Sequence, residues 1–154
     1  MSCSPAFLSE IDRAARSVAP ETLELMFFAT VAQTPVRRLA EHWNILVPFR
    51  GEPSGLFEMR IERDLARELA AAFLGLENRA EVADAYAQQV AHELANIVCG
   101  SILSRAESET GFALGSPKAV AEAECIADPD YHSVFVAESG GILEIAFRMD
   151  DTVC

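Results

Sequence analysis

The segment from about Asn78 to Ala106 constrains the fold most, because its apolar residues recur at the spacing of one long helix. A helix turns by about 100° per residue, so residues three or four apart share a face. The apolar face of this segment predicts burial and comprises Ala83, Ala87, Val90, Ala91, Leu94, Val98 and Ile102, with Ile97 near its edge. Asn78 is a suitable N-cap. We therefore predict a single helix over residues 78–106, and its buried face requires no function.

The opposite side of this helix carries a polar strip, which comprises Gln89, Glu93, Asn96 and Gly100. Glu93 and Asn96 are three residues apart, so their side chains are neighbours. Glycine inside a helix costs about 1 kcal/mol relative to alanine, and at Gly100 the missing side chain would let another backbone approach. Leu103 extends the strip with an apolar side chain suited to docking. A glutamate and an asparagine at this spacing also occur by chance on solvated helices, so the strip by itself leaves its function open.

The composition predicts one soluble, globular domain over residues 1–154. Hydrophobic residues make up 51% of the chain, and 24 acidic residues face 12 basic ones, for a net charge of -12. This charge repels phosphate backbones and anionic lipid, which argues against nucleic acid and membranes as partners. It favours either simple solubility or a partner with a basic rim. The chain shows no secretory signal or bilayer-spanning segment, so we expect a cytoplasmic protein.

Two helices and a hairpin are predicted before the long helix. A helical pattern runs from Ser4 toward Val31, with Pro20 expected to kink or split it. Its last part is very apolar and is expected to be buried: Leu23, Leu25, Met26, Phe27 and Phe28. Alternation over 43–49 and 57–61 predicts a hairpin with one face on the core. A short helix follows, capped by Asp64 and ended by Gly75, and its predicted inner face comprises Leu65, Leu69, Ala72 and Phe73.

Strand signals return after Ala106. Alternating apolar residues over 134–136 and 142–147 flank Ser139-Gly140-Gly141, which predicts a second hairpin. The order of elements indicates a duplicated unit in which a long helix precedes antiparallel strands. The predicted fold class is therefore α/β in the α+β sense. No glycine-rich turn of the dinucleotide-binding or P-loop kind is present.

Metal chemistry is poorly supported by the histidines and cysteines. His92 and Glu93 begin an H-E-x-x-N sequence, in which Asn96 replaces the second histidine that a zinc site of the H-E-x-x-H kind needs. His42 and His132 show no partner pattern. The four cysteines form no C-x-x-C pair, so free thiols are expected. We therefore predict no metal or cofactor in this chain.

The stretch from His92 to Gly100 resembles the signature helix of the CheC/CheX/FliY family of chemotaxis phosphatases. That family carries E-x-x-N on a long exposed helix, with a proline further downstream, which Pro117 resembles here. The duplicated helix-plus-strands layout is also similar, which implies a CheC-like fold with a sheet packed against long helices. Two positions depart from the usual pattern: Gln89 stands where Asp or Ser is common, and Pro117 falls slightly nearer to Asn96 than the commonest spacing.

The resemblance implies a phosphatase that removes the phosphoryl group from the aspartate of a CheY-like response regulator. Asn96 would orient the attacking water, because an amide both donates and accepts hydrogen bonds, and Glu93 would pair with the regulator's active-site lysine. Gln89, Gly100 and Leu103 would contact the partner. The Mg²⁺ ion is expected in the regulator and not in this chain.

The first half of the duplication favours the CheX-like branch. Aligning Glu24-Leu25-Met26-Phe27 with Glu93-Leu94-Ala95-Asn96 places Phe27 where a second asparagine would stand, so one site per chain is expected. The resemblance also implies a homodimer, for which the C-terminal strands would provide an edge.

Two other functions remain open. A non-catalytic module with this fold would bind a regulator or another signalling partner through the same strip, and a domain that uses a different surface is also compatible with the sequence. The sequence does not identify the regulator or the pathway.

Overall fold

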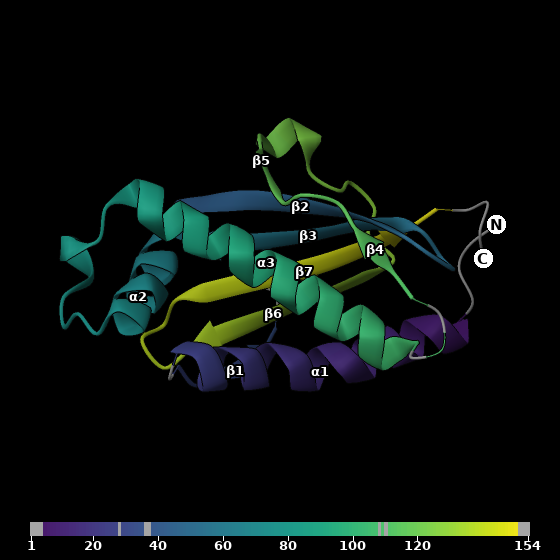
Figure 1. Ribbon diagram of the computed structural model, residues 1–154, viewed down its shortest axis with the longest axis horizontal. Helices are drawn as coiled ribbons and strands as arrows, with labels where there is room; N and C mark the ends of the chain where they lie inside the picture. Colours follow the sequence, from purple (N-terminus) through teal and green to yellow (C-terminus); the bar gives the residue numbers. More distant parts are fainter. Residues whose placement is uncertain (1–4, 28, 36–37, 108, 110, 151–154) are drawn as a thin grey trace.

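The structure is a computed structural model that describes residues 5–27, 29–35, 38–107, 109 and 111–150. It combines helices with one seven-stranded antiparallel sheet (Figure 1), which confirms the predicted α+β class. The helices are α1 (Pro5–Phe27), α2 (Arg63–Leu74) and α3 (Asp84–Ala106), with short 3-10 turns η1 (Arg79–Glu81) and η2 (Glu122–Glu124). The strands are β1 (Val31–Thr34), β2 (His42–Arg50), β3 (Gly55–Glu62), β4 (Ala113–Leu114), β5 (Lys118–Val120), β6 (Tyr131–Ala137) and β7 (Ile142–Met149).

The sheet topology supports the predicted duplication. Its strand order is β1-β6-β7-β3-β2-β4, and β5 also pairs with β2. The hairpins β2–β3 and β6–β7 therefore meet through β3 and β7 at the centre, where Met59 lies opposite Ile145. The short strands that follow each long helix pair with the hairpin of the other unit: β1 pairs with β6, and both β4 and β5 pair with β2. Each unit thus contributes edge strands to the hairpin of the other unit, and a pseudo-twofold axis relates the two units.

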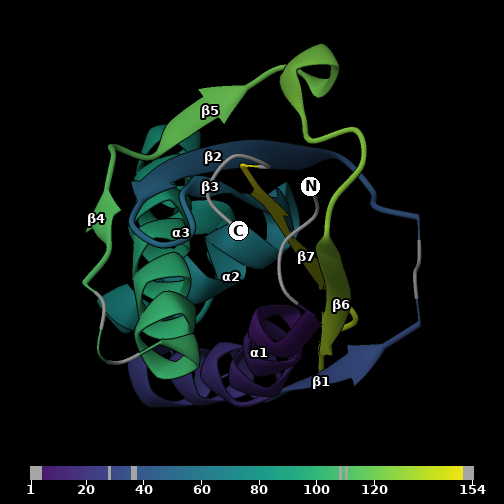
Figure 2. The same ribbon diagram turned by 90° about the vertical axis from the view of Figure 1, so that its right-hand side faces the viewer.

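The core lies between the sheet and the helices. Figure 2 shows α1, α2 and α3 on the concave side of the curved sheet. Alternate residues of the four long strands point toward these helices, as period-two alternation requires. The largest of them are completely buried: Phe57, Phe135, Phe147, Ile45, Met59 and Ile61. None of the helices in the described ranges is long and apolar enough to cross a bilayer.

A polar network covers part of the convex face. The buried Glu58 accepts hydrogen bonds from Arg60 Nε at 2.9 Å and from the backbone N–H of Ile126 at 2.8 Å. His42 Nε2 lies 2.9 Å from Glu122 Oε1. These contacts hold the segment around η2 against β2 and β3. His132 of β6 also has a partner, Glu144 of β7 at 2.7 Å, so both histidines that showed no partner pattern in the sequence lie within hydrogen-bond distance of a glutamate.

Helix α1 differs from its prediction in two respects. Pro20 lies inside one continuous helix, so it does not split the segment. The apolar end of α1 is only partly buried: Leu23 and Phe27 are in the core, whereas Leu25 is 78% exposed and Met26 is 36% exposed. Helical geometry explains the difference, because Leu25 and Met26 point in other directions around the helix than Leu23 and Phe27, which are four residues apart and share a face. Phe28 lies outside the described residues.

The first hairpin is confirmed, and α2 follows it with three corrections. The N-cap of α2 is Glu62, and Asp64 lies in the first turn instead. Gly75 ends the helix in the left-handed region, as predicted, with φ of 74°. Leu65 and Leu69 are buried, but Ala72 is half-buried and Phe73 is 59% exposed. The apolar pattern therefore placed Phe73 on the buried face, whereas the structure leaves most of its ring at the surface.

The second hairpin is confirmed, but it provides little sheet edge. Strand β6 pairs with both β1 and β7, and β7 pairs with both β6 and β3. The expectation that the C-terminal strands offer an edge for dimerisation is therefore met only in part, because among the described residues the uncovered edge of β6 is confined to residues 131–133. The other edge positions belong to β1, β4 and β5, which are short strands that offer few unpaired backbone groups.

Candidate functional site

Helix α3 begins later than its apolar pattern predicted. The Asn78 side chain accepts a hydrogen bond from the N–H of Ala80 at 2.9 Å and so caps η1 instead of the long helix. Val82 is extended and ends that turn, and Asp84 opens α3. Asp84 suits the first turn, where a carboxylate stabilises the positive end of the helix dipole, and Arg67 of α2 donates to it. The predicted end at Ala106 is confirmed.

The buried side of α3 is wider than one face. Leu94, Val98 and Ile102 are fully buried as predicted, but Ala83 precedes the helix and is exposed. A second stripe is also completely buried at intervals of four residues: Ala95, Cys99 and Leu103. The prediction that Leu103 extends the exposed strip is therefore wrong. The physical reason is that α3 packs against α1 and α2 as well as β2 and β3, so most of its circumference is apolar.

Glu93 and Asn96 lie on the remaining accessible side of α3. Glu93 and Gln89 are exposed, one helical turn apart, and Asn96 is half-buried. In the part of the chain that the structure describes, neither Glu93 nor Asn96 has a hydrogen-bond or ion-pair partner. A carboxylate and an amide three residues apart are thus both left free to contact another molecule.

The Gly100 end of the strip is covered by the chain itself. A methyl group added at Gly100 would lie 3.2 Å from the Leu114 Cδ1 atom of β4. Gly100 is accordingly half-buried, and its absent side chain makes room for Leu114. Pro117 is half-buried between β4 and β5, in the segment that follows this contact. The accessible strip therefore reduces to Gln89, Glu93 and Asn96.

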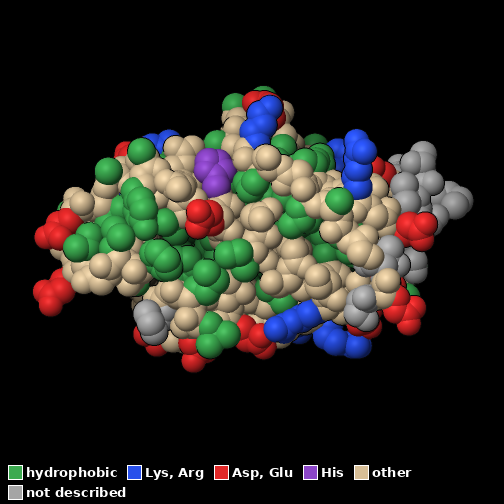
Figure 3. All heavy atoms as spheres, viewed as in Figure 1, with side chains coloured by type: hydrophobic (Ala, Val, Ile, Leu, Met, Phe, Trp, Pro, Cys, Tyr) green, Lys and Arg blue, Asp and Glu red, His purple; other side chains and the backbone are tan. Residues whose placement is uncertain are grey.

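An apolar hollow adjoins the Glu93 end of the strip. It has a volume of about 200 Å³ and lies between the ends of α1 and α2 and the first half of α3. Its lining comprises Met26, Phe27, Phe73, Tyr86, Gln89, Val90, Glu93, Leu94 and Ile97. Figure 3 shows hydrophobic side chains gathered over these elements. The sequence analysis missed this hollow, because residues of three separate helices form it and only tertiary packing brings them together.

Cys99, three residues after Asn96, is not available as a nucleophile. Burial raises the pKa of the Cys99 thiol well above its ordinary range, which removes its thiolate at neutral pH. Cys99 and Cys125 are free, as expected, and Cys3 and Cys154 lie outside the described residues. Among the described residues, no group of three histidine, cysteine or acidic side chains has the geometry to hold a metal ion.

Helix α1 is the counterpart of α3 in the duplicated unit, and both helices contain 23 residues. Aligning their ends places Ala14 and Ser17 at the positions of Glu93 and Asn96, in place of the Glu24 and Phe27 that sequence matching proposed. The conclusion of one E-x-x-N pair per chain holds in either alignment, because the first asparagine in the chain is Asn44 in β2.

Solved structures share this fold at low sequence identity. A CheX chemotaxis protein from Vibrio vulnificus has a TM-score of 0.66 and 19% identity over 95% of this chain and 100% of that chain. CheX in the CheX–CheY–BeF3–Mg²⁺ complex from Borrelia burgdorferi has a TM-score of 0.65 and 15% identity, over 94% and 98%. FliY from Thermotoga maritima has a TM-score of 0.63 and 15% identity, over 99% and 94%. No curated protein matches the chain by sequence.

The sequence itself identifies the family. The profile described as "Chemotaxis phosphatase CheX" matches residues 44–138, which is more than half of the chain and includes α3 with Glu93 and Asn96. This match agrees with the duplicated topology and with the E-x-x-N pair on the accessible side of α3. The chain therefore belongs to the CheX family of chemotaxis phosphatases.

Proposed function

We propose that this chain dephosphorylates the phospho-aspartate of a CheY-like response regulator. The observation that carries the proposal is the accessible pair on α3, in which Glu93 and Asn96 have no partner among the described residues. Family membership supports a role in chemotaxis signalling. The Borrelia burgdorferi relative was solved in a complex with CheY, BeF3 and Mg²⁺, which supports a regulator of that kind as the partner.

In this mechanism Asn96 positions a water molecule for attack on phosphorus. The amide oxygen accepts a hydrogen bond from the water, and the amide nitrogen donates one, which fixes the orientation of the water. Attack forms the new P–O bond while the bond to the aspartate oxygen breaks, so the products are phosphate and a free carboxylate. The regulator holds the Mg²⁺ ion that neutralises charge on the phosphoryl group. Positioning of this kind lowers the barrier without a general base in this chain.

Glu93 sets the register of docking in the same mechanism. Its exposed carboxylate would pair with the regulator's active-site lysine and bring Asn96 over the phosphoryl group. A charge pair across an interface contributes specificity, and truncating one partner costs about 2–5 kcal/mol when the pair is desolvated. Gln89, one turn before Glu93, lies at the edge of the same contact.

The decisive variant is Asn96→Ala. We expect it to lower stimulated phosphate release by about 100-fold or more, because the attacking water loses its orientation. The melting temperature should not fall, since Asn96 is half-buried and has no partner in the described structure. Ser104→Ala, an exposed substitution on the same helix, should leave both quantities unchanged. The assay follows phosphate release from a phosphorylated CheY-like regulator, and full activity of Asn96→Ala would refute the proposal.

A non-catalytic regulator-binding module is the second candidate. It is favoured by the half-burial of Asn96 and by Leu114, which already occupies the space above Gly100. It predicts that the chain binds a beryllofluoride-activated regulator while the lifetime of the phosphorylated regulator stays unchanged. Measuring binding and phosphate lifetime on the same pair of proteins separates the two candidates.

A further inference from the structure

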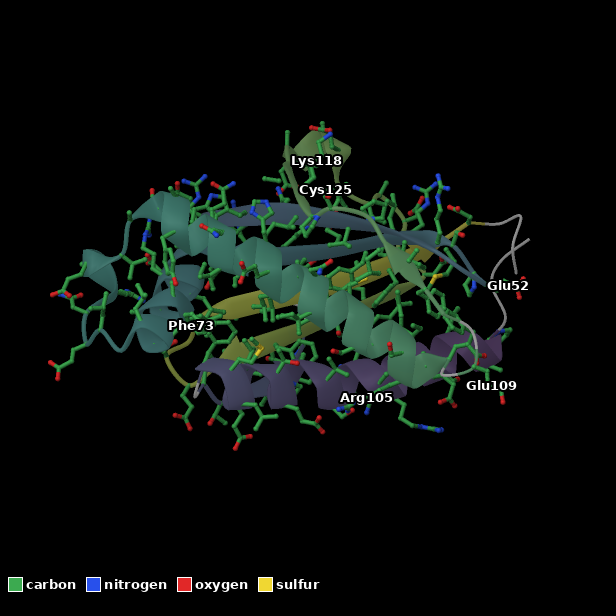
Figure 4. The ribbon with its side chains drawn as sticks, viewed as in Figure 1. Glu52, Phe73, Arg105, Glu109, Lys118 and Cys125 are labelled. Atoms are coloured by element: carbon green, nitrogen blue, oxygen red, sulfur yellow. The ribbon has the colours of Figure 1, made fainter. Side chains whose placement is uncertain are left out.

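The hollow beside Glu93 differs from the rest of the acidic surface. Among the described residues that line it, Glu93 is the only charged one, and the other linings are mostly apolar. Phe73 is 59% exposed at its edge, and Met26 is 36% exposed. Figure 4 shows Phe73 on α2, close to the end of α1, where its ring lies 6.2 Å from that of Phe27. Exposed aromatic and thioether side chains around a hollow are typical of an interaction surface.

The size of the hollow restricts its occupant. Pockets for small organic ligands measure about 300–1,000 Å³, whereas this one measures about 200 Å³. Such a volume suits one large apolar side chain inserted from a partner, as occurs at the centre of protein interfaces. A depression of about 620 Å³ near the start of α1, around Leu8 and Asp12, shares none of its lining with the candidate site.

We infer that the hollow accepts one apolar side chain that a response regulator presents next to the lysine paired with Glu93. This inference rests on the proposed function and names a second contact of the same interface. Gln89 and Glu93 belong both to the accessible strip and to the hollow, so a partner that reaches Asn96 passes directly over it. The Glu93 carboxylate is the one charge among the described residues of this apolar surface, so it complements a lysine that has an apolar side chain next to it.

Asn96 and the hollow contribute to different kinetic constants in the proposed interface. Asn96 acts on the water, so its removal lowers kcat. The hollow lies beyond Glu93 and away from the reacting phosphorus, so it binds the ground state and the transition state equally. Loss of such uniform binding raises KM and leaves kcat unchanged. An inserted side chain also excludes water from one side of Glu93, which strengthens the pairing with the lysine.

The test measures phosphate release against regulator concentration for Phe73→Ala. We expect KM to rise about tenfold with kcat unchanged, the usual size of effect for an interface anchor. Phe73→Leu keeps an apolar side chain and should restore most of the affinity. Leu25→Ala is the matched control, because Leu25 is 78% exposed yet lies outside the hollow. Thermal melting of each variant establishes that the fold is retained.

A second readout separates this inference from the proposed function. Binding of a beryllofluoride-activated regulator with Mg²⁺ is measured for the unmodified chain, Phe73→Ala and Asn96→Ala. Weaker binding by Phe73→Ala than by the unmodified chain supports the inference. It does so even if the chain does not accelerate phosphate loss and the phosphatase proposal is refuted. Unchanged KM and binding in Phe73→Ala, with activity that still depends on Asn96, would overturn the inference alone. A lower molar mass of Phe73→Ala than of the unmodified chain by light scattering, without a change in regulator binding, would assign the hollow to a second copy of this chain. That result would also overturn the inference.

Discussion

The helices α1 and α3 begin the two halves of the duplication and have the same length, yet their accessible surfaces differ. At the position of α1 that matches Glu93, Ala14 is buried, and four nearby charges pair with one another, Glu10 with Arg13 and Asp12 with Arg16. On α3 Glu93 has no partner among the described residues. Pairing along a helix satisfies charges locally, whereas an unpaired carboxylate beside an apolar hollow is available to another molecule. Under the proposed function, the duplicated scaffold presents its binding surface on α3 and not on α1.

The buried faces of the two helices also differ. When the helix ends are aligned, Leu94 corresponds to Ala15 and Val98 to Ala19, and all four are completely buried. Helix α3 thus projects larger side chains into the core, and α1 has small residues at the matching positions. The face of α3 that bears the candidate site is therefore backed by rigid packing, which holds Glu93 and Asn96 in a fixed relation.

The comparison between the buried faces of α1 and α3 is tested most strongly by Leu94→Ala, for which we expect the largest change in the free energy of unfolding. Truncating this completely buried leucine leaves a cavity and should lower the free energy of unfolding by about 2–5 kcal/mol. The reciprocal change, Ala15→Leu, overpacks α1 and should cost about 1–3 kcal/mol. Urea unfolding measures both. A cost below 1 kcal/mol for Leu94→Ala would mean that α3 packs no more tightly than an exposed helix.

A smaller effect is expected for Gly100→Ala. Alanine gains about 1 kcal/mol of helix propensity over glycine, but its methyl group would lie 3.2 Å from Leu114 Cδ1. That atom is the end of a flexible side chain and can give way, so we expect a net stabilisation below about 1 kcal/mol. Because Leu114 already covers the position, phosphatase activity should not change.

The outcome for Gly100→Ala also tests how the partner approaches. A loss of activity would show that the regulator displaces Leu114 and reaches the helix backbone, as the sequence first suggested for Gly100. Leu114→Ala alone and combined with Gly100→Ala provides the control, since it removes the crowded contact without changing the helix.

The smallest expected effect on stability concerns the ion pair between Arg105 of α3 and Glu21 of α1. Arg105 of α3, labelled in Figure 4, donates to Glu21 of α1 at 2.6 Å and to Ser17 at 2.9 Å. The hydrogen bond from Arg105 lowers the pKa of the Glu21 carboxyl group below its ordinary value. A lowered folded-state pKa means that the stabilisation is present above the ordinary pKa and is lost as the pH falls through the lowered value. Because Glu21 is fully exposed, the change in stability should be slight.

An NMR titration of the Glu21 carboxyl group measures this bridge directly. Arg105→Ala should return the pKa of Glu21 toward its ordinary value. Arg13→Ala removes the same charge from the surface without touching Glu21 and serves as the control. An unshifted Glu21 in the unmodified chain would show that the two helices are not linked through this pair.

Several features of this protein were predictable from the sequence, because each depends on the geometry of a short segment. Helical periodicity identified α3 and placed Glu93 and Asn96 side by side. Strand alternation and turn residues identified both hairpins, including the turn at Gly140, whose φ is 93°. The E-x-x-N pair led to the family that the match over residues 44–138 confirms. These patterns can be interpreted without knowing which helices and strands pack against one another.

The tertiary structure decided which apolar residues are covered, because long-range packing sets burial. Leu103 was expected to be exposed and is buried between neighbouring elements, whereas Phe73 was expected to be buried and is 59% exposed. The contact of Leu114 with Gly100 and the hollow beside Glu93 both join segments far apart in the chain. Local spacing specifies directions around a helix, and only the assembled fold determines what lies in each direction. The Glu93–Asn96 pair came from the sequence, and the hollow beside it came from the meeting of three helices.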